Sequence, residues 1–291
     1  MRTQRNSLNH AARLACVLCL PLLASGCRLR GAVKEVYVSQ HLNAGVAALQ
    51  SGKTREAATE LERVLEVEPD HLEARELLLT TLLQNKQYDE VIQVLGKRPP
   101  ADRTVQDLFL LADASDKAGR VNDAETFYRE AVERAKGTPQ YPVALNNFGY
   151  MLANHGRNLP ESLRLLTEAD RLMPNQGTIV DSLSWVYYRL GDHQRALTEI
   201  DRACRLAPTN GDLHYHRGMI LLGLGKEADA ATAFRLATVL DPHNKEAATQ
   251  LQRRGGTARR PASVAGGPKK PWEKAAQTLK DLVERARREL F

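Results

Sequence analysis

The chain has 291 residues, of which 43% are hydrophobic, 26% are charged and only 5% are aromatic, and its formal net charge is +6. One hydrophobic core of this size would lie near the upper limit for a single domain, so we expect two domains or a repeat array. Helix formers dominate, and strict alternation of apolar and polar residues is confined to short stretches. This argues against a β-rich fold and predicts an all-α protein.

The N-terminus has the pattern of an export signal. Arg2, Arg5 and Arg13 precede an apolar run over residues 14–24, and small residues occupy 24–26. As a helix, the eleven residues of that run rise only about 16 Å, too little to span the hydrocarbon core of a bilayer. Residues 1–26 are therefore predicted to be a signal peptide; the alternative is a buried N-terminal helix.

The stretch LLASGC, residues 22–27, resembles the lipobox of bacterial lipoproteins, although Ala24 stands where that family favours Leu. The resemblance implies that Cys27 is lipidated and becomes the first mature residue, and that Arg28 after it permits sorting to the outer membrane, facing the periplasm. Each buried methylene contributes about 0.8 kcal/mol, so three acyl chains would anchor the protein firmly. The alternative is a plain secreted protein with a free Cys27.

The other cysteines carry no predicted chemistry. Cys16 and Cys19 would be discarded with the signal, and lipidation of Cys27 would leave Cys204 without a partner for an intramolecular disulfide. Cys204 stands between apolar neighbours in a helical pattern and is expected to pack as a small hydrophobe.

A period of 34 residues runs through the second half of the chain. It separates Pro174, Pro208 and Pro242, and it separates Gly191 from Gly225. Small residues allow two helices to approach closely, a large apolar residue fills the space beside them, and proline ends the second helix of a pair. The residues in register with the prolines follow this rule: Ala169, Ala203, Ala237, Ala196, Ala230, Leu166, Ile200 and Phe234.

This pattern resembles the tetratricopeptide-repeat family, in which each repeat is an antiparallel helix pair. HLNAGVAALQSGKTREAATELERVLEVEP and DLFLLADASDKAGRVNDAETFYREAVERA match it, whereas LEARELLLTTLLQNKQYDEVIQVL has bulky residues in small positions and is cut short by Pro99-Pro100. The resemblance implies a right-handed superhelix, an α-solenoid of about six helix pairs, over residues 38–250 after a tether at 27–37. A capping helix over 243–254 is expected, as is a longer turn around GRNLPES.

The stretch DSLSWVYYRLGD, residues 181–192, concentrates aromatic residues. Helical spacing directs Val180, Leu183, Ser184 and Tyr187 toward the partner helix. The resemblance implies that Trp185 and Tyr188 line the concave groove; alternatively, they pack against adjacent repeats. The candidate groove residues are Asn147, Tyr150, Asn154, Trp185, Tyr188, Arg189, Tyr215, His216 and Met219.

Grooves of this family bind peptides or helices of other proteins, and aromatic side chains suit such surfaces. The paired Lys, Arg and Asn of the carboxylate-clamp subfamily are matched only by Asn147 and Arg189, so that specificity is not expected. ALNNFGYMLANHG and DSLSWVYYRLGD resemble envelope lipoproteins that scaffold pilus assembly, secretion or periplasmic proteolysis. The hypothesis is a scaffold lipoprotein with a protein partner. The alternatives are a pilotin-like assembly factor for an outer-membrane pilus or secretion complex, and a non-lipidated adaptor.

Charge divides the chain. Residues 1–26 carry three cations and no acid, and residues 251–291 carry eleven Lys or Arg and four Asp or Glu; with +6 overall, residues 27–250 carry a net −4. Residues 251–271 are predicted to be a flexible linker and 272–291 a basic amphipathic helix. That helix could fold onto the array, meet a partner helix, or lie on an anionic membrane. Export and the lack of a recognition motif argue against nucleic acid.

Enzyme chemistry is not expected. SGKT at residues 51–54 resembles the end of a phosphate-binding loop, but Ala47 stands where the motif requires Gly and the context is helical. His214 and His216 project from opposite sides of a helix and cannot share a metal. No catalytic constellation can be assigned from spacing, and neither a cofactor nor a metal is predicted.

Overall fold

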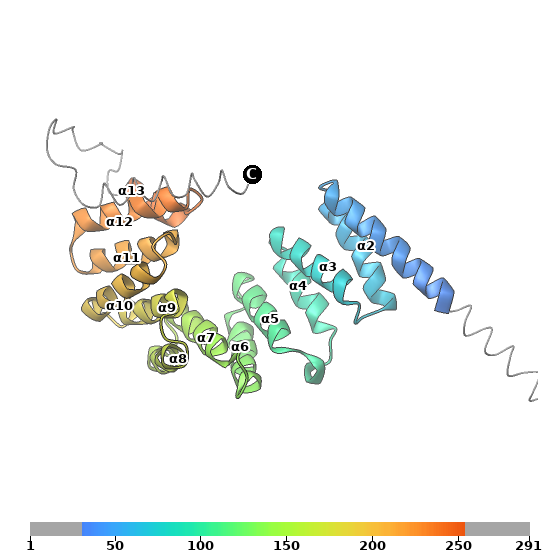
Figure 1. Cartoon of the computed structure of the whole chain (residues 1–291), viewed down its shortest axis with the longest axis horizontal. Helices are drawn as coiled ribbons and strands as arrows, with labels where there is room; N and C mark the ends of the chain where they lie inside the picture. The colour runs from blue at the N-terminus through green and yellow to red at the C-terminus, as the bar shows by residue number, and fades with distance from the viewer. Residues whose placement is uncertain (1–30, 254–291) are drawn as a thin grey trace, which may run out of the picture. The chain divides into compact units, whose positions relative to one another are not determined.

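The computed structural model describes residues 31–253 (Figure 1). Cys27, the predicted signal peptide and the predicted C-terminal helix lie outside the described residues, as does all of the predicted linker except 251–253. Within 31–253, no helix is long and apolar enough to cross a bilayer.

Every regular element in the described part of the chain is a helix. A helix over residues 31–50 comes first, and the rest follow in this order: α2 (Thr54–Val67), α3 (Leu72–Gln84), α4 (Tyr88–Gly96), the 3-10 helix η1 (Pro100–Asp102), α5 (Val105–Lys117), α6 (Val121–Ala135), α7 (Tyr141–His155), α8 (Leu159–Leu172), α9 (Gly177–Arg189), α10 (His193–Leu206), α11 (Gly211–Gly223), α12 (Glu227–Leu240) and α13 (Lys245–Arg253). Residues 31–240 thus form six helix pairs, and α13 follows the last, which confirms the predicted all-α repeat fold.

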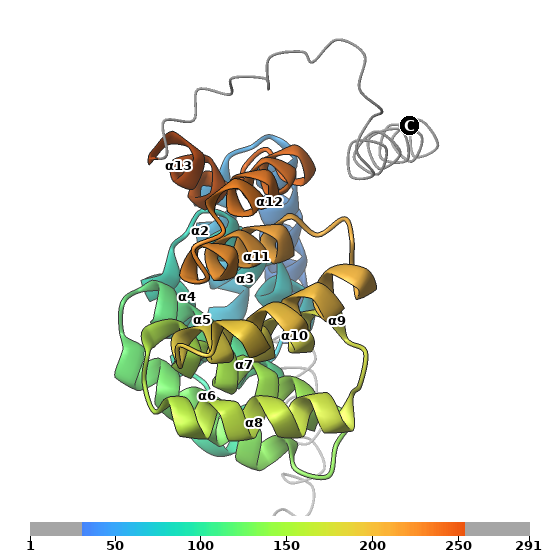
Figure 2. The same cartoon turned by 90° about the vertical axis from the view of Figure 1, so that its left-hand side faces the viewer.

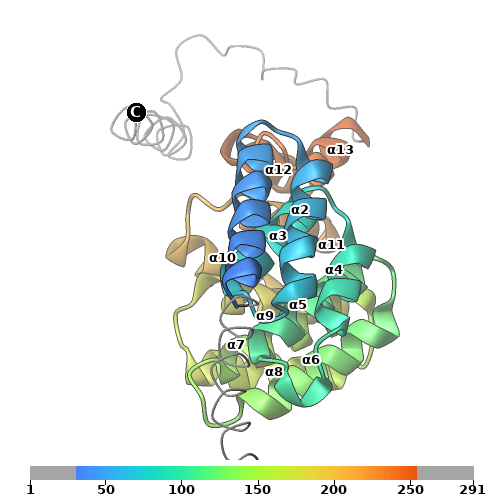
Figure 3. The same ribbon diagram turned by 90° about the vertical axis from the view of Figure 1, so that its right-hand side faces the viewer.

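The described residues fall into two compact units. The first comprises residues up to 103 together with 113–120, and the second comprises 104–112 and the residues from 121 onward. In the first unit, the helix over residues 31–50 lies beside α2 (Figure 3), and α3 contacts both α2 and α4.

The second unit contains three successive pairs: α7 with α8, α9 with α10, and α11 with α12 (Figure 2). The first helices of these pairs also contact one another, since α9 packs against both α7 and α11. Residues on α7, α9 and α11 are therefore brought onto neighbouring helices although they are about one repeat apart in sequence. We call the face that these three helices form the first-helix face.

In two pairs of the second unit, α7 with α8 and α11 with α12, the close approach of the helices depends on a glycine opposite a large side chain. A Cβ added to Gly149 would lie 2.7 Å from Cγ of Leu166, and one added to Gly218 would lie 2.5 Å from Cε1 of Phe234. Leu166 and Phe234 are fully buried. The large position of the sequence period thus meets a glycine on the first helix of its pair, a small position that was not among those identified from the sequence.

The second pair departs from the pattern as its prolines predict. α4 has 9 residues, whereas α2, α8, α10 and α12 each have 14 and α6 has 15. It ends at Gly96, shortly before Pro99 and Pro100, because proline lacks an amide donor and disfavours helix in the residue before it.

Three boundaries differ from the sequence-based predictions. The turn between α7 and α8 is not longer than the others, because α7 itself extends to 15 residues and Gly156, with φ of 66°, closes it directly. Residues 31–37 are helical rather than part of a tether, because they continue the helix that pairs with α2. Residues 251–253 form the last turn of α13 rather than the start of a linker.

The glycine contact predicts the effect of adding one methyl group. Gly218→Ala should lower the free energy of unfolding by about 1–3 kcal/mol, because the buried Phe234 ring cannot yield, and this exceeds the gain of about 1 kcal/mol from helix propensity. The urea midpoint of helical circular dichroism measures it. Gly96→Ala is the control: an added Cβ there meets nothing within 4 Å, so its midpoint should not fall. A Gly218→Ala midpoint at or above wild type would contradict this explanation.

Candidate functional site

The first-helix face brings most of the predicted groove residues together. Trp185 of α9 belongs to a buried hydrophobic cluster. Packed against this cluster are Tyr188 of α9, Met219 of α11 and Tyr150 of α7. The spacing of one repeat in the sequence therefore becomes adjacency in the fold.

Four rings from α9 and α11 form a continuous series, which we call the aromatic row: Tyr188, Trp185, His216 and Tyr215. The ring centroids of Tyr188 and Trp185 are 4.8 Å apart with planes 24° from parallel, and those of Trp185 and His216 are 4.4 Å apart at 27°. Tyr215 lies 5.5 Å from His216 at 48°. These distances are those of stacked or tilted aromatic pairs that attract one another.

Trp185 is the buried centre of the row and not its exposed edge. Its side chain is 8% exposed, so the predicted groove exposure of this ring is wrong. Helical spacing correctly predicted that Trp185 does not lie on the face of α9 that packs against α10. The face on which it does lie is covered by His216 of the neighbouring helix α11. The half-buried members of the site are Tyr150, Tyr188, Tyr215 and Met219, and these are the side chains that a ligand can reach.

The indole Nε1 of Trp185 is buried and has no hydrogen-bond partner among the described residues. A buried donor without an acceptor costs about 1–3 kcal/mol relative to a satisfied one. Burial of the indole is therefore supported by ring packing and not by hydrogen bonding.

A buried ion pair lies beneath the row. Nδ1 of His216 lies 2.8 Å and 2.9 Å from the two carboxylate oxygens of Asp181 and donates to them. Both residues are less than 9% exposed and belong to adjacent repeats, so the pair fastens α11 to α9. Asp181 was not among the predicted residues; the signal was its position 35 residues before His216, close to one repeat period.

The charge of Asp181 controls the state of His216. Burial lowers the pKa of His216, but the carboxylate of Asp181 raises it by charge and by hydrogen bonding, with a smaller contribution from Asp212, and the net effect is a pKa above the ordinary 6.5. The neighbouring His214 behaves oppositely, because burial, its largest influence, lowers its pKa.

Arg189, predicted to line the groove, instead forms a hydrogen bond within the array. Its Nη1 donates to the main-chain carbonyl of Asn154 in the last turn of α7. Gly156 makes room for it, since a Cβ there would lie 2.6 Å from Nη2 of Arg189. Arg189 and Asn154 thus connect two successive pairs, while Asn147 is half-buried and its Oδ1 accepts from Asn146 at 3.2 Å.

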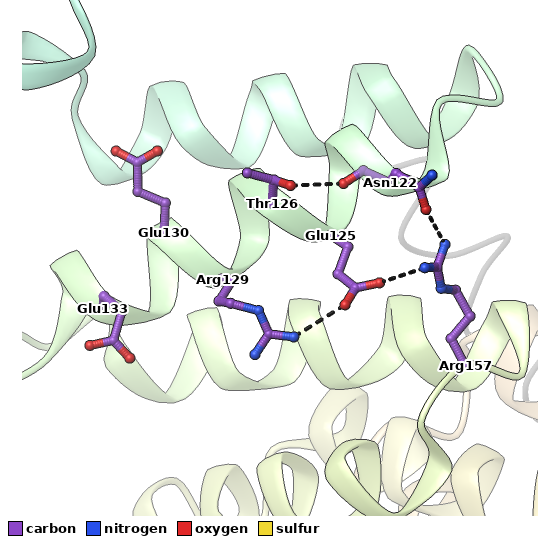
Figure 4. Close-up of a pocket in the computed structure, with 7 residues that line it drawn as sticks. All are labelled: Asn122, Glu125, Thr126, Arg129, Glu130, Glu133 and Arg157. Atoms are coloured by element: carbon purple, nitrogen blue, oxygen red, sulfur yellow. Dashed lines mark hydrogen bonds and ion pairs between the residues drawn. The ribbon is translucent and has the colours of Figure 1, made fainter.

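A second surface feature is a charged hollow of about 520 Å³ on α6 (Figure 4). Arg129 bridges Glu125 at 3.1 Å and Glu161 of α8 at 2.8 Å, and Arg157 reaches Glu125 at 3.1 Å. Each charge drawn at its centre already has an opposite partner, so the hollow is best explained as an ionic connection between pairs.

The shortened α4 leaves a cleft in the first unit. It measures about 720 Å³, has Leu65, Leu78 and Leu95 among its apolar walls, and has both acidic and basic side chains at its edge. It lies where the last turns of a longer second helix would be, between the C-terminal half of α2 and the segment after α4. Pro99-Pro100 was the only sequence signal for it.

The described residues offer little for other chemistry. No group of three or more His, Cys, Asp and Glu side chains within 31–253 could hold a metal ion. Burial raises the pKa of the Cys204 thiol to about 12, so it stays protonated and unreactive at neutral pH.

Comparison with known families agrees with this architecture. Two models, each described as tetratricopeptide repeat, match residues 48–108 and 182–245. The chain is a tetratricopeptide-repeat protein. The first match includes the shortened second pair, and the second includes most of α9 and all of α10 to α12.

A TPR repeat-containing protein of Pseudomonas aeruginosa is 30% identical over 147 residues, or 49% of this chain, and the match covers 24% of that protein. The chain thus spans about a quarter of the length of that curated relative.

Solved structures share the fold. The pilF protein of Pseudomonas aeruginosa superposes with a TM-score of 0.52 at 17% identity, over 76% of this chain and 99% of its own. PilW, a type IV pilus biogenesis factor, superposes with a TM-score of 0.55 at 15% identity, over 74% of this chain and 98% of its own. The Cut9-Hcn1 structure superposes with a TM-score of 0.55 at 16% identity, over 74% of this chain and 42% of its own.

The His216–Asp181 pair predicts a pH dependence with a definite sign. Because the folded-state pKa of His216 is raised, the stability due to the pair is fully present below pH 6.5 and is lost as the pH rises through the folded-state pKa. Asp181→Asn should therefore lower the free energy of unfolding most at acidic pH, and its urea midpoint should approach that of wild type at alkaline pH.

The pKa of His214 is lowered, so its contribution to stability changes with pH in the opposite sense. This contribution is the same in wild type and in Asp181→Asn, so it cancels when their urea midpoints are subtracted. An NMR titration of the His216 ring provides a direct check: its pKa should lie above 6.5 in wild type and fall in Asp181→Asn. A difference between the two midpoints that is independent of pH would refute the assigned ion pair.

Proposed function

We propose that this protein is a non-enzymatic scaffold lipoprotein of the bacterial envelope that binds a peptide or helix of a partner protein on its first-helix face. The observation that carries the proposal is the aromatic row, a rigid stack with half-buried Tyr188 and Tyr215 on either side of a buried centre. Repeat proteins of this kind use such continuous faces for binding.

The chemistry of the face favours an apolar segment. Tyrosine and methionine offer large contact area, and the tyrosines lose little rotamer freedom when they bind. The cation predicted for the face, Arg189, is engaged by Asn154, and Asp212 on α11 is an exposed acid. An acidic C-terminal peptide is therefore a poor match, and a helix or strand with spaced apolar side chains is a good one.

Placement in the envelope rests on the N-terminal sequence. The cations before residue 14, the apolar run and the LLASGC stretch support export, lipidation of Cys27 and an outer-membrane position facing the periplasm. Neither cofactor nor nucleic acid enters the proposal.

A second candidate is a pilotin-like assembly factor for an outer-membrane pilus or secretion complex. It is favoured by the likeness to pilF and to PilW, a type IV pilus biogenesis factor, because each superposes over nearly its whole length. This role would use the same face on an oligomeric partner. It differs in requiring that assembly of the complex fails when the protein is removed.

Photocrosslinking in cells tests the face. A benzophenone amino acid at Tyr188 or Tyr215 should give one discrete adduct with a partner protein, and Met219→Ala should reduce its yield. Val239 on α12, which is 57% exposed, is the control position and should not give that adduct. Trp185→Ala is unsuitable, because removing a buried ring costs about 3–5 kcal/mol and would affect binding through folding.

Equal adducts at positions 188, 215 and 239, or none at the first two, would refute the proposed face. An adduct with a subunit of a ring-forming outer-membrane complex, together with loss of that ring in cells lacking the protein, would favour the assembly factor.

Mass spectrometry of the mature N-terminus tests the anchor. We expect an acylated Cys27 as the first residue in the outer-membrane fraction, and an unmodified, soluble product from Cys27→Ser. A mature chain that begins elsewhere, or a Cys27 without acyl chains, would contradict the lipoprotein proposal while leaving the binding face untouched.

A further inference from the structure

The first helix of the chain is longer than the helix it pairs with. It covers residues 31–50, which is 20 residues, whereas α2 has 14. All side chains from 31 to 37 are exposed, and Val38 is the first buried residue. These first turns, which we call the overhang, therefore extend past the end of α2 (Figure 1).

The overhang carries an apolar stripe. Val33 is 62% exposed, Val36 is 66% exposed and Tyr37 is 36% exposed. Spacings of three and four residues place these three side chains on one side of the helix. Glu35 lies on the opposite side, and Lys34 pairs with Glu68 of the first unit at 3.2 Å. We call Val33, Val36 and Tyr37 the overhang stripe.

We propose that the overhang stripe docks into the headgroup region of the membrane that anchors the protein, so that the start of the first repeat lies on the bilayer surface. This inference rests on the proposed lipidation of Cys27, and it adds a second, non-covalent membrane contact. Short amphipathic helices with an apolar side bury that side about 5–10 Å into the interface.

The short distance along the chain between Cys27 and the overhang favours the membrane as the surface that the stripe contacts. Only four residue steps separate Cys27 from Gly31, so the overhang begins within about 14 Å of the acylated residue whatever the conformation between them. Since the headgroup layer on each side is about 5–8 Å thick, an anchored Cys27 keeps these turns at the membrane surface.

Side-chain chemistry agrees with that position. Tyr37 combines an apolar ring with a hydroxyl, as interfacial tyrosines do. Arg28 and Arg30 precede the overhang in sequence, and a cation close to an anionic surface contributes about 1 kcal/mol. Lys34 adds less, because Glu68 already neutralises part of its charge.

A second copy of the chain is a poorer occupant. One aromatic side chain buries at most about 250 Å², and two valines and a tyrosine on each side fall well short of the roughly 1,200 Å² that a stable interface needs. A bilayer needs no complementary partner surface, and it is already held within reach by the anchor.

Site-specific fluorescence tests the docking on the full, acylated chain. In a Cys204→Ser background, Val36→Cys or Glu35→Cys is labelled with an environment-sensitive dye and reconstituted on vesicles of phosphatidylethanolamine and phosphatidylglycerol that contain nitroxide lipids. We expect quenching about twofold or more stronger at 36 than at 35, because the two sites lie at nearly the same point along the helix axis but only Val36 lies on the apolar side. Ser51→Cys, about 22 Å further along the helix, should show little quenching.

Each result decides between occupants. Equal quenching at 35 and 36, or none at 36, in a sample whose mass confirms acylated Cys27 would overturn the docking and leave the anchor intact. Energy transfer between labelled copies without vesicles would assign the stripe to a second copy and overturn it as well. An unacylated Cys27 would overturn both the anchor and this inference, while crosslinking on the first-helix face would still report the partner.

Discussion

The structure depends on the close approach of the two helices in each pair. In the pairs α7–α8 and α11–α12, a glycine in the first helix faces a large buried side chain in the second: Gly149 faces Leu166 and Gly218 faces Phe234, with no room for a methyl group between them. In the second unit, neighbouring pairs stack with their first helices in contact, since α9 packs against both α7 and α11. Where the second helix is short, as in α4, the same stacking leaves a cleft.

The aromatic row follows from this stacking. α9 and α11 come close enough for Trp185 to stack on His216, and the Asp181 carboxylate holds His216 from beneath. Rings fixed in this way cannot adapt freely to a ligand, so the surface offered by Tyr188 and Tyr215 is largely preformed. Rigidity favours affinity for a segment of matching shape, while the engaged Arg189 removes the cation that would favour an acidic one.

The sequence was sufficient for the repeat period, the number of pairs and the early end of α4, because helix periodicity and proline act locally. Helical spacing also separated the core residue Val180 from Trp185. It could not predict how deeply Trp185 is buried, because that depends on a ring 31 residues later, on another helix. The start of the first helix was missed because that end carries no strong local signal. The end of α7 was missed although Gly156 marks it, because the extra residue of this repeat was assigned to the turn and not to the helix.

The shortness of α4 has a consequence for how the array unfolds. In a repeat protein, the stability of each element comes from itself and its immediate neighbours. α4 buries only Val91 and Leu95, whereas α6 buries five side chains. Its amides should therefore exchange with solvent earlier than those of α6, and among the second helices of the pairs α4 should open first. Such an opening would uncouple the folding of the first pair from that of the later pairs, so that a force applied at the N-terminal end need not reach the aromatic row.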